Sequence, residues 1–382
     1  MTVRHECKIC VDFGSSRTKF LFATETSQHF YELPKRDRSF APSKFDEELS
    51  VIFSILEEDW PWLHTIHQLR LIFVSTWPSW VVLDTKGEIV EFFSFDDLRS
   101  RKPINFETPI YSCDYKARTA WLEVNEVPFS DILPLSSYCA YRICKKLFAD
   151  EFTWEMGGGE NGAFPILSAG SEVILLERYK LPSGKSIKII LHAGTGDTIS
   201  ALIGGSVTDT QAPITHLEVG TTPIILKRDD ANEKPYVSYS LPNFFKQFFT
   251  DIAPELLVDS TNLTRALNVK PKLNNRKSFG IEFKPSNYES DLIFLSEACV
   301  EFDAKLLRVP VAHRLEYAIR FLIEHILEQL PEVQQLSVGG SIGASTLCLS
   351  IIEELGLEVV RSEAYASLLG GMFLLKNEEV RL

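Results

Sequence analysis

The chain has 382 residues, of which 45% are hydrophobic and 24% charged, and it carries a formal net charge of −13. This length exceeds the roughly 250–300 residues that one hydrophobic core usually serves, so two domains are expected. The acidic balance argues against nucleic acid or an anionic membrane as the main partner, because neutralising phosphates requires clustered Lys and Arg side chains. It leaves open a phosphorylated small ligand, which needs only local donors.

The N-terminal segment lacks the basic, apolar and small-residue regions of a signal peptide, and no apolar run approaches the roughly 18 residues that span a bilayer. A cytoplasmic location is therefore expected. The cysteines agree with it, because an odd, scattered set without a secretion signal is typical of reduced thiols. They are Cys7, Cys10, Cys113, Cys139, Cys144, Cys299 and Cys348.

The pair Cys7 and Cys10 has the spacing of a zinc or redox motif. No second pair and no His residue follows at metal-ligand spacing. The pair also lies in a run that alternates as a strand does, in which the two thiols would point to opposite faces. We therefore interpret both as buried thiols, which pack as small apolar side chains.

Strand-like runs and segments with helical spacing alternate along the chain. In the first half, strands are predicted within 8–24, 68–93 and 170–194, with turns at 84–88 and 181–185, and a helix within 138–152. The second half gives a strand pair at 215–228, weak signals over 230–300, a long helix at 311–330, a strand, glycine-rich turn and helix at 334–356, and a small-residue helix at 362–376. This mixture indicates the α/β class.

Two distant segments share one plan, in which a strand, a small-residue turn with one Asp and a second strand follow each other. They are KICVDFGSSRTKFLFAT (8–24) and IKIILHAGTGDTISALIGG (187–205). If the two domains derive from one duplicated unit, these hairpins would face each other across a cleft. Each would then present an acid and a row of backbone N–H groups.

The acids Asp12 and Asp197 gain a chemical meaning from these turns. Small residues let a ligand approach the backbone closely, and successive N–H groups form an anion-binding nest. In-line phosphoryl transfer to an alcohol needs a metal, a phosphate cradle and a carboxylate that accepts the hydroxyl proton. Magnesium typically takes one or two carboxylates with phosphate oxygens and waters. The alternative is that both turns are ordinary hairpins, in which Asp is a favoured residue.

The turn segments resemble, in order, the motifs of the FGGY-type carbohydrate kinases of the actin-like ATPase superfamily. VDFGSSRTKFLFAT (11–24) is similar to the first phosphate motif, HAGTGDTISALIGG (192–205) to the segment with the catalytic Asp, and EVGTTPIILKR (218–228) to the second phosphate motif. LSVGGSIGASTLCLSIIEELGLEVV (336–360), followed by EAYASLLGG (363–371), resembles the adenosine motif and its closing helix.

Further matches lie between these motifs. FDDLRS (95–100) is similar to a Trp-x-Asp-x-Arg segment of the family, with Phe95 in the Trp position and Asp97 and Arg99 retained. KARTAWLEVNEVP (116–128) resembles the stretch that follows it, and VAHRLEYAIRFLIEHIL (311–327) matches the long helix before the adenosine motif. The resemblance therefore covers nearly the whole chain.

The resemblance implies a role for each matching residue. Asp12 would hold Mg²⁺, usually through water, and Asp197 would be the general base that takes a proton from the sugar hydroxyl. The phosphate contacts would come from Gly14, Ser15 and Ser16, with Arg17 or Lys19 nearby, and from Gly220, Thr221 and Thr222 of the second domain. Adenosine would lie over Gly339, Gly340 and Ser341. The sugar side would include Trp77, Asp97, Arg99 and Thr195.

Some segments depart from the family pattern. The chain is short for the family, and FGIEFKPSNYESD (279–291) stands where the second domain usually has a Pro-Leu-x-Gly-Glu-Arg-x-Pro motif. EMGGGENG (155–162) is not set between a strand and a helix, so a flexible loop on the substrate side is favoured over a phosphate loop. His192 is interpreted as a satisfied core residue rather than a second base. Packing is favoured as the role of the aromatic residues around 58–67, and stacking of Trp77 and Trp80 on a sugar ring is the less favoured alternative.

The prediction for the fold is two actin-like (ribonuclease H-like) α/β domains, residues 1–205 and 206–382, with mixed sheets flanked by helices and a cleft between them. The predicted function is ATP- and Mg²⁺-dependent phosphorylation of a small sugar. A pentulose such as xylulose or ribulose is favoured, and gluconate or a polyol is open. The expected partners are this sugar and ATP, without nucleic acid or membrane, and with homodimerisation left open. The alternatives are a catalytically degenerate kinase-like sensor or scaffold and, third, another actin-like ATPase.

Overall fold

The structure is a computed structural model. It describes residues 6–14, 17–34, 40–77, 79–94, 97, 115–159, 164–206, 215–219, 223–228, 235–240, 244–258, 260–271, 281–284, 299–331, 333–363 and 365–375. The chain divides into two compact units. Met1–Gly204 and Ser367–Leu382 make up unit 1, and Gly205–Ala366 makes up unit 2.

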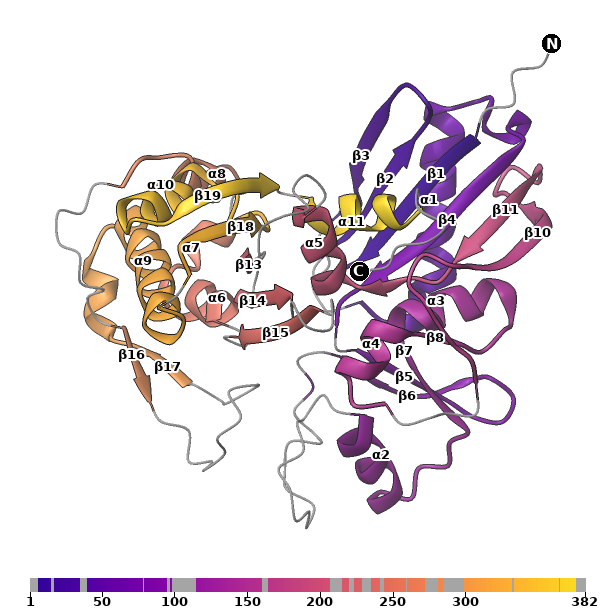
Figure 1. Ribbon diagram of the computed structural model, residues 1–382, viewed down its shortest axis with the longest axis horizontal. Helices are drawn as coiled ribbons and strands as arrows, with labels where there is room; N and C mark the ends of the chain where they lie inside the picture. Colours follow the sequence, from indigo (N-terminus) through magenta and orange to yellow (C-terminus); the bar gives the residue numbers. More distant parts are fainter. Residues whose placement is uncertain are drawn as a thin grey trace. The chain divides into compact units, whose positions relative to one another are not determined.

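In the described part of unit 1, seven strands form the main sheet (Figure 1). Six lie in the order β10 (Glu172–Lys180), β11 (Ser186–His192), β4 (Gln68–Ser75), β1 (Glu6–Phe13), β2 (Thr18–Ala23) and β3 (Gln28–Glu32), and the short β12 (Thr195–Gly196) also pairs with β4. β4 runs parallel to β1, β11 and β12, whereas β1 runs antiparallel to β2. The sheet is therefore mixed.

Different helices cover the two faces of this sheet (Figure 1). One face packs against α1 (Phe45–Asp59) and α3 (Leu135–Cys144), in a core that contains alternate residues of β1, namely Cys7, Ile9, Val11 and Phe13. On the other face lies α11 (Ala366–Leu374), so close that a Cβ at Gly371 would overlap the Cys10 sulfur. Residues 367–375 thus belong to unit 1, although they follow unit 2 in the chain.

The strand alternation confirms the interpretation of the two N-terminal cysteines. Cys7 lies in the core under α1, and Cys10 faces α11. Both side chains are fully buried, and burial raises the pKa of Cys7 to about 12. At neutral pH the thiols stay protonated and act as core residues.

Two smaller sheets add to the described part of unit 1. One has the order β6 (Ile89–Phe93), β5 (Trp80–Leu83) and β7 (Asp131–Pro134), and the other pairs β8 (Ala149–Asp150) with β9 (Ile166–Leu167). The remaining described helices of this unit are α2 (Tyr115–Val124), α4 (Glu151–Met156), α5 (Asp197–Ser206) and the 3₁₀ turns Pro42–Lys44 and Leu63–Thr65.

Unit 2 has its own core. In its described residues a five-stranded mixed sheet has the order β15 (Pro235–Ser240), β14 (Pro223–Arg228), β13 (Thr215–Val219), β18 (Gln335–Gly339) and β19 (Glu358–Glu363), and β16 (Ile281–Lys284) pairs with β17 (Cys299–Phe302). The described helices are α6 (Phe244–Gln247), a π-turn (Phe248–Ile252), α7 (Glu255–Val258), α8 (Ser260–Leu267), a 3₁₀ turn (Ala304–Arg308), α9 (Val311–Gln329) and α10 (Thr346–Glu354). α9 buries apolar residues three and four positions apart, as an amphipathic helix does.

Several predicted elements are confirmed. The hairpin of β1 and β2, that of β10 and β11, the pair β13 and β14, the long helix α9 and the strand, turn and helix of β18 and α10 all form where the pattern placed them. Among the described residues, no helix combines the length and the apolar character that crossing a membrane would require.

Three local predictions are wrong. Residues after Asp197 form the helix α5 instead of a second strand. The strand was predicted because a short buried apolar run has no periodicity that separates strand from helix. The single helix predicted within 138–152 ends at Cys144, where Lys145 takes a left-handed conformation (φ 57°), and β8 and α4 follow. Asp12 itself lies in β1 rather than in the turn after it.

Candidate active site

Asp197 is the first residue of α5 and follows directly on β12. Its Oδ1 accepts hydrogen bonds from the backbone N–H of Trp77 (3.1 Å), the backbone N–H of Thr198 (2.7 Å) and Thr198 Oγ1 (3.2 Å). The side chain is partly exposed. A carboxylate at the first turn of a helix is favoured by the positive end of the helix dipole. The local structure thus fixes the orientation of this carboxylate.

The glycines before Asp197 are needed for close contacts. A Cβ at Gly194 would overlap the carbonyl oxygen of Phe73 in β4, and a Cβ at Gly196 would lie 2.7 Å from Trp77 Cβ. Small residues therefore let this segment lie directly against β4 and the residues after it. This is the structural reason for the small-residue pattern around Asp197.

The predicted sugar-side residues have different surroundings. Trp77 is partly exposed and lies against Gly196 and Asp197. Thr195 is fully buried, and its hydroxyl donates to Asp150 Oδ1 at 3.0 Å. Trp80 is also fully buried and packs against Tyr115 and Trp154, so its suggested stacking on a sugar ring is wrong.

Asp12 lies near the end of β1, on the face covered by α11, and its side chain is 5% exposed. Its Oδ2 accepts a hydrogen bond from Ser367 Oγ at 2.7 Å. The carbonyl oxygen of Ser367 in turn accepts from Ser200 Oγ of α5 at 2.6 Å. One residue of α11 is therefore bonded both to Asp12 and to the helix that begins with Asp197.

The predicted phosphate residues around the first turn are only partly described. Lys19 lies opposite Asp12 in the antiparallel pair of β1 and β2, so the two side chains share a face of the sheet. Arg17 forms an ion pair with Glu32 at 2.6 Å. A Cβ at Gly14 would lie 3.0 Å from the Arg17 carbonyl oxygen and 4.0 Å from Asp12 Oδ1. Glycine at this position thus avoids a tight contact with the backbone of this turn, while the Asp12 carboxylate beside it is buried.

Asp97 interacts with Arg118 of α2. The Arg118 guanidinium, fully buried and 4.7 Å from the Phe93 ring centroid, donates to the Asp97 carbonyl oxygen at 3.3 Å and lies 3.9 Å from Asp97 Oδ1. The other predicted site residues lie outside the described residues. These are Ser15, Ser16, Arg99, Gly220, Thr221 and Thr222.

In unit 2 the predicted adenosine motif forms the turn between β18 and α10. Gly340 has a φ of +82°, and a Cβ there would lie 2.5 Å from the carbonyl oxygen of Val219. A Cβ at Gly339 would overlap the carboxylate of Glu218. Position 340 therefore requires glycine, whereas a side chain at position 339 would have to displace the Glu218 carboxylate, and Ser341 is exposed.

A buried histidine holds Glu218 beside this turn. His216 Nε2 lies 3.1 Å from Glu218 Oε2, and its Nδ1 lies 3.2 Å from Ser337 Oγ. Because a carboxylate only accepts hydrogen bonds, Nε2 is the nitrogen that donates. This pair was not predicted from the sequence, because it becomes apparent only once β13 and β18 are aligned and His216 faces Ser337.

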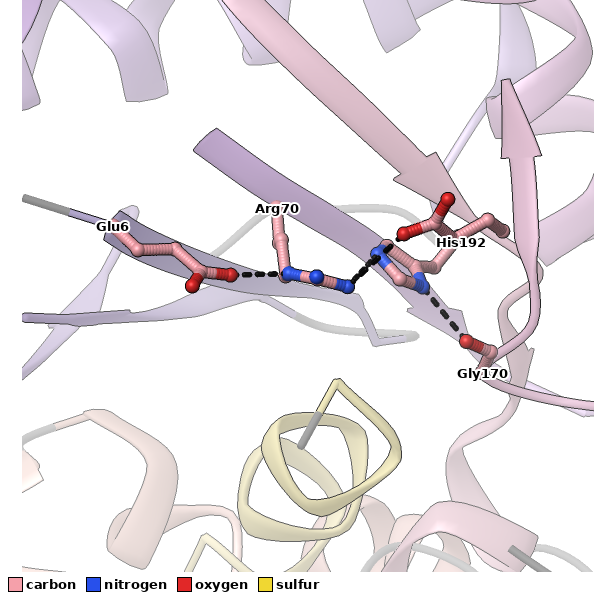
Figure 2. Close-up of polar contacts among 5 residues, drawn as sticks. Glu6, Arg70, Gly170 and His192 are labelled. Atoms are coloured by element: carbon pink, nitrogen blue, oxygen red, sulfur yellow. Dashed lines mark hydrogen bonds and ion pairs between the residues drawn. The ribbon is translucent and has the colours of Figure 1, made fainter. Parts of the chain in front are cut away.

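His192 is confirmed as a satisfied core residue (Figure 2). Its Nδ1–H donates to the carbonyl oxygen of Gly170 at 2.7 Å, and its Nε2 faces the Arg70 guanidinium at 3.3 Å. Arg70 is also paired with Glu6 and with Glu172. Burial, reinforced by Arg70, lowers the pKa of His192, although the Gly170 hydrogen bond opposes the shift. The imidazole is therefore neutral and has both nitrogens occupied.

Two further residues near Asp197 were not predicted from the sequence, Asp150 and Thr153. Asp150 is fully buried, and Thr153 accepts a hydrogen bond from the Gly196 N–H at 3.1 Å. Their spacing is that of an acid capping a helix, since Thr153 N donates to Asp150 Oδ1 at 2.9 Å. That local signal marks the start of α4 but gives no indication of the contact with β12.

Comparison with solved structures shows the fold. A xylulose kinase from Brucella ovis has a TM-score of 0.70 at 15% identity, covering 97% of this chain and 90% of that one. A gluconate kinase from Lactobacillus acidophilus has 0.68 at 14%, covering 97% and 89%. A glycerol kinase from Plasmodium falciparum, solved with ADP, has 0.63 at 13%, covering 97% and 89%. The sequence itself matches no family model and no curated protein.

At these identities the similarity concerns the fold. The chain has the two-domain actin-like fold of the FGGY-type sugar kinases, with mixed sheets flanked by helices, as the sequence predicted. Its residues superpose along nearly the whole length of those enzymes. Any catalytic activity of this chain therefore depends on the arrangement of its own side chains.

Proposed function

We propose that this protein is an ATP-dependent kinase that transfers the γ-phosphoryl group to a hydroxyl of a small sugar, with a pentulose as the favoured substrate. The observation that carries this proposal is the placement of Asp197. It is a partly exposed carboxylate at the start of a helix, beside Trp77, in a segment whose glycines let the chain lie tight against β4. The fold it shares with xylulose, gluconate and glycerol kinases supports the same activity.

In this proposal Asp197 is the general base. Its Oδ1 is oriented by N–H and O–H donors of Trp77 and Thr198. A carboxylate held in this way can accept the proton of a substrate hydroxyl as the oxygen attacks phosphorus. Trp77 lies beside it and offers an indole as an apolar wall for the sugar.

Asp12 is the proposed magnesium residue. Mg²⁺ prefers oxygen ligands and usually takes one or two carboxylates together with phosphate oxygens and waters. The Asp12 carboxylate, which is buried and accepts a hydrogen bond from Ser367 on Oδ2, would supply such an oxygen. No group of three or more acidic, His or Cys side chains gathers for a metal within the described ranges, so water and phosphate would complete the coordination. Bound Mg²⁺ neutralises charge on the phosphates.

A second candidate function is nucleotide or sugar binding without transfer. The Arg17–Glu32 ion pair favours it, since Arg17 then offers less charge to a transferred phosphate. Asp197 disfavours it, because a binding protein has no use for an oriented base.

A coupled ADP-release assay tests the proposal. Wild-type protein with ATP and Mg²⁺ is screened against pentuloses, hexuloses, polyols and gluconate, with Asp197→Asn as the matched control. We expect a sugar-dependent rate that falls about 10²–10⁴-fold in the variant, the usual contribution of a general base. Nucleotide affinity, measured by calorimetry, should stay within about twofold. Binding of ATP or a sugar with no stimulated ADP release would instead establish the second candidate.

A further inference from the structure

Asp150 is a buried acid whose contacts are concentrated on one oxygen. It ends β8, immediately before α4, and is 0% exposed. Oδ1 accepts hydrogen bonds from Thr153 N (2.9 Å), Thr153 Oγ1 (2.9 Å) and Thr195 Oγ1 (3.0 Å). Oδ2 is equally buried and has no hydrogen-bond partner among the residues that the structure describes.

These bonds connect α4 to the segment that leads into Asp197. Thr195 donates its hydroxyl proton to Asp150, and the Gly196 N–H donates to Thr153 Oγ1 at 3.1 Å. Thr195 and Gly196 are the two residues of β12, directly before Asp197. On its other side β12 pairs with Val74 and Ser75 of β4. The backbone before Asp197 is thus held between β4 and the first turn of α4.

Capping of α4 does not by itself account for this acid. A Ser, Thr or Asn side chain caps a helix about as well as Asp. Burying a carboxylate oxygen without a hydrogen-bond donor destabilises the folded state. This destabilisation exceeds the stabilisation that an N-cap gives to such a short helix. Burial accordingly raises the pKa of Asp150 to about 6, although the hydrogen bonds from Thr153 and Thr195 oppose the rise. Costly polar groups of this kind gather at functional sites.

We propose that Asp150 is a positioning residue for Asp197, acting through Thr153 and Thr195 on the two residues that precede the base. The inference rests on the function proposed above. Asp150 touches neither substrate nor reacting atoms; it sets where α5 begins and therefore where the Asp197 carboxylate lies. A displacement of about 1 Å in a catalytic group can cost roughly 10²-fold in rate, so this buried link would matter for turnover while ground-state binding stays intact.

The test compares Thr153→Val with Thr153→Ser. Valine keeps the shape of the side chain but removes the acceptor of the Gly196 N–H, whereas serine keeps the hydroxyl. Asp150→Asn is the second variant, since it keeps an acceptor oxygen and removes the charge. The readouts are kcat and KM for sugar and ATP, and hydrogen–deuterium exchange of peptides that cover residues 193–198.

We expect Thr153→Val to lower kcat by about 10- to 100-fold, with both KM values within twofold and faster exchange over residues 193–198. The kcat of Thr153→Ser should lie within threefold of the wild-type value. The kcat of Asp150→Asn should lie between those of the two Thr153 variants. Equal kcat values for the Val and Ser variants would overturn the positioning role, as would a rise in KM without loss of kcat. If Thr153→Val does not fold, the test depends on Asp150→Asn. A kcat and a hydrogen–deuterium exchange rate equal to those of wild type in this variant would overturn the positioning role. A wild-type protein that phosphorylates no sugar is a different result, which rejects the proposed function.

Discussion

The hydroxyl of Ser367 donates a hydrogen bond to the Asp12 carboxylate, with 2.7 Å between the two oxygens, although Ser367 follows Asp12 by 355 positions in the chain. The same residue accepts a hydrogen bond from Ser200 in α5 through its carbonyl oxygen. The two proposed active-site acids are therefore linked through one turn of α11. Because of this link, replacing Ser367 is expected to affect the Asp12 carboxylate.

Ser367→Ala is expected to weaken the use of magnesium. A hydrogen bond to a charged group contributes about 1.5–3 kcal/mol, and without it the Asp12 side chain gains rotamer freedom. The apparent Mg²⁺ concentration for half-maximal rate should rise by about tenfold or more if that contribution is lost in full, with KM for the sugar little changed. Ser54→Ala, an exposed serine on α1, is the matched control. An unchanged Mg²⁺ requirement would count against the role of Asp12.

Gly194→Ala is expected to destabilise unit 1 severely. The added Cβ would overlap the Phe73 carbonyl oxygen, and backbone cannot yield as a flexible side chain can. Overpacking of this kind costs typically about 1–3 kcal/mol, and more where backbone is involved. Gly184→Ala is the control, because its Cβ would meet nothing within 4 Å and only its φ of +83° costs energy, about 1 kcal/mol. Urea unfolding of the two variants compares the costs; equal midpoints would contradict the prediction.

His192 is expected to make the protein less stable in mild acid. Its pKa is lowered in the folded state, so below about pH 6.5 the unfolded chain takes up a proton that the native imidazole does not. The free energy of unfolding therefore falls as the pH drops from 6.5 toward the lowered native pKa. His192→Gln, which cannot titrate, should lose this part of the pH dependence. Unfolding curves at pH 7.5 and 5.5 measure it, and parallel behaviour of both proteins would exclude the effect.

Asp150, unlike His192, is expected to make the protein more stable in mild acid. Its folded-state pKa is raised from 3.8 to about 6, so between these values the native state holds a proton that the unfolded chain has lost. Acidification from pH 6 to 4 thus stabilises the native state, by up to about 3 kcal/mol for a shift of this size. Asp150→Asn should abolish this contribution. A steeper rise in stability on acidification in the variant than in wild type would contradict the assigned direction.

Elements with a clear local pattern could be predicted from the sequence. The hairpin of β13 and β14 and the amphipathic helix α9 each have a complete signal within their own residues, and both form as expected. The segment after Asp197 has no such signal. Its small and apolar residues are buried on all sides, with Ile199, Ala201, Leu202 and Ile203 all at most 5% exposed, so neither a two-residue nor a 3.6-residue period is visible.

The two acids of the candidate site were predicted from the sequence, but the residues that hold these acids in place were not. Asp12 and Asp197 stand in conspicuous small-residue segments. Asp150 and Ser367 become significant only through contacts that span 45 and 355 residues, and no local pattern encodes those pairings. They depend on the register of β12 against β4 and on the packing of α11 over β1, which the fold as a whole determines.

The position of α11 also has a consequence for biosynthesis. Because its residues follow unit 2 in the chain, the ribosome delivers the Asp12 partner only after unit 2. The strands of unit 1 are synthesised first but remain without the helix that covers one face, so Cys10 and Asp12 stay open to water until residues 367–375 have been added. Unit 2 can form its hydrophobic core before the core of unit 1 is complete. A chain truncated before Ser367 and released from the ribosome should therefore show a folded second unit and an unfinished first one.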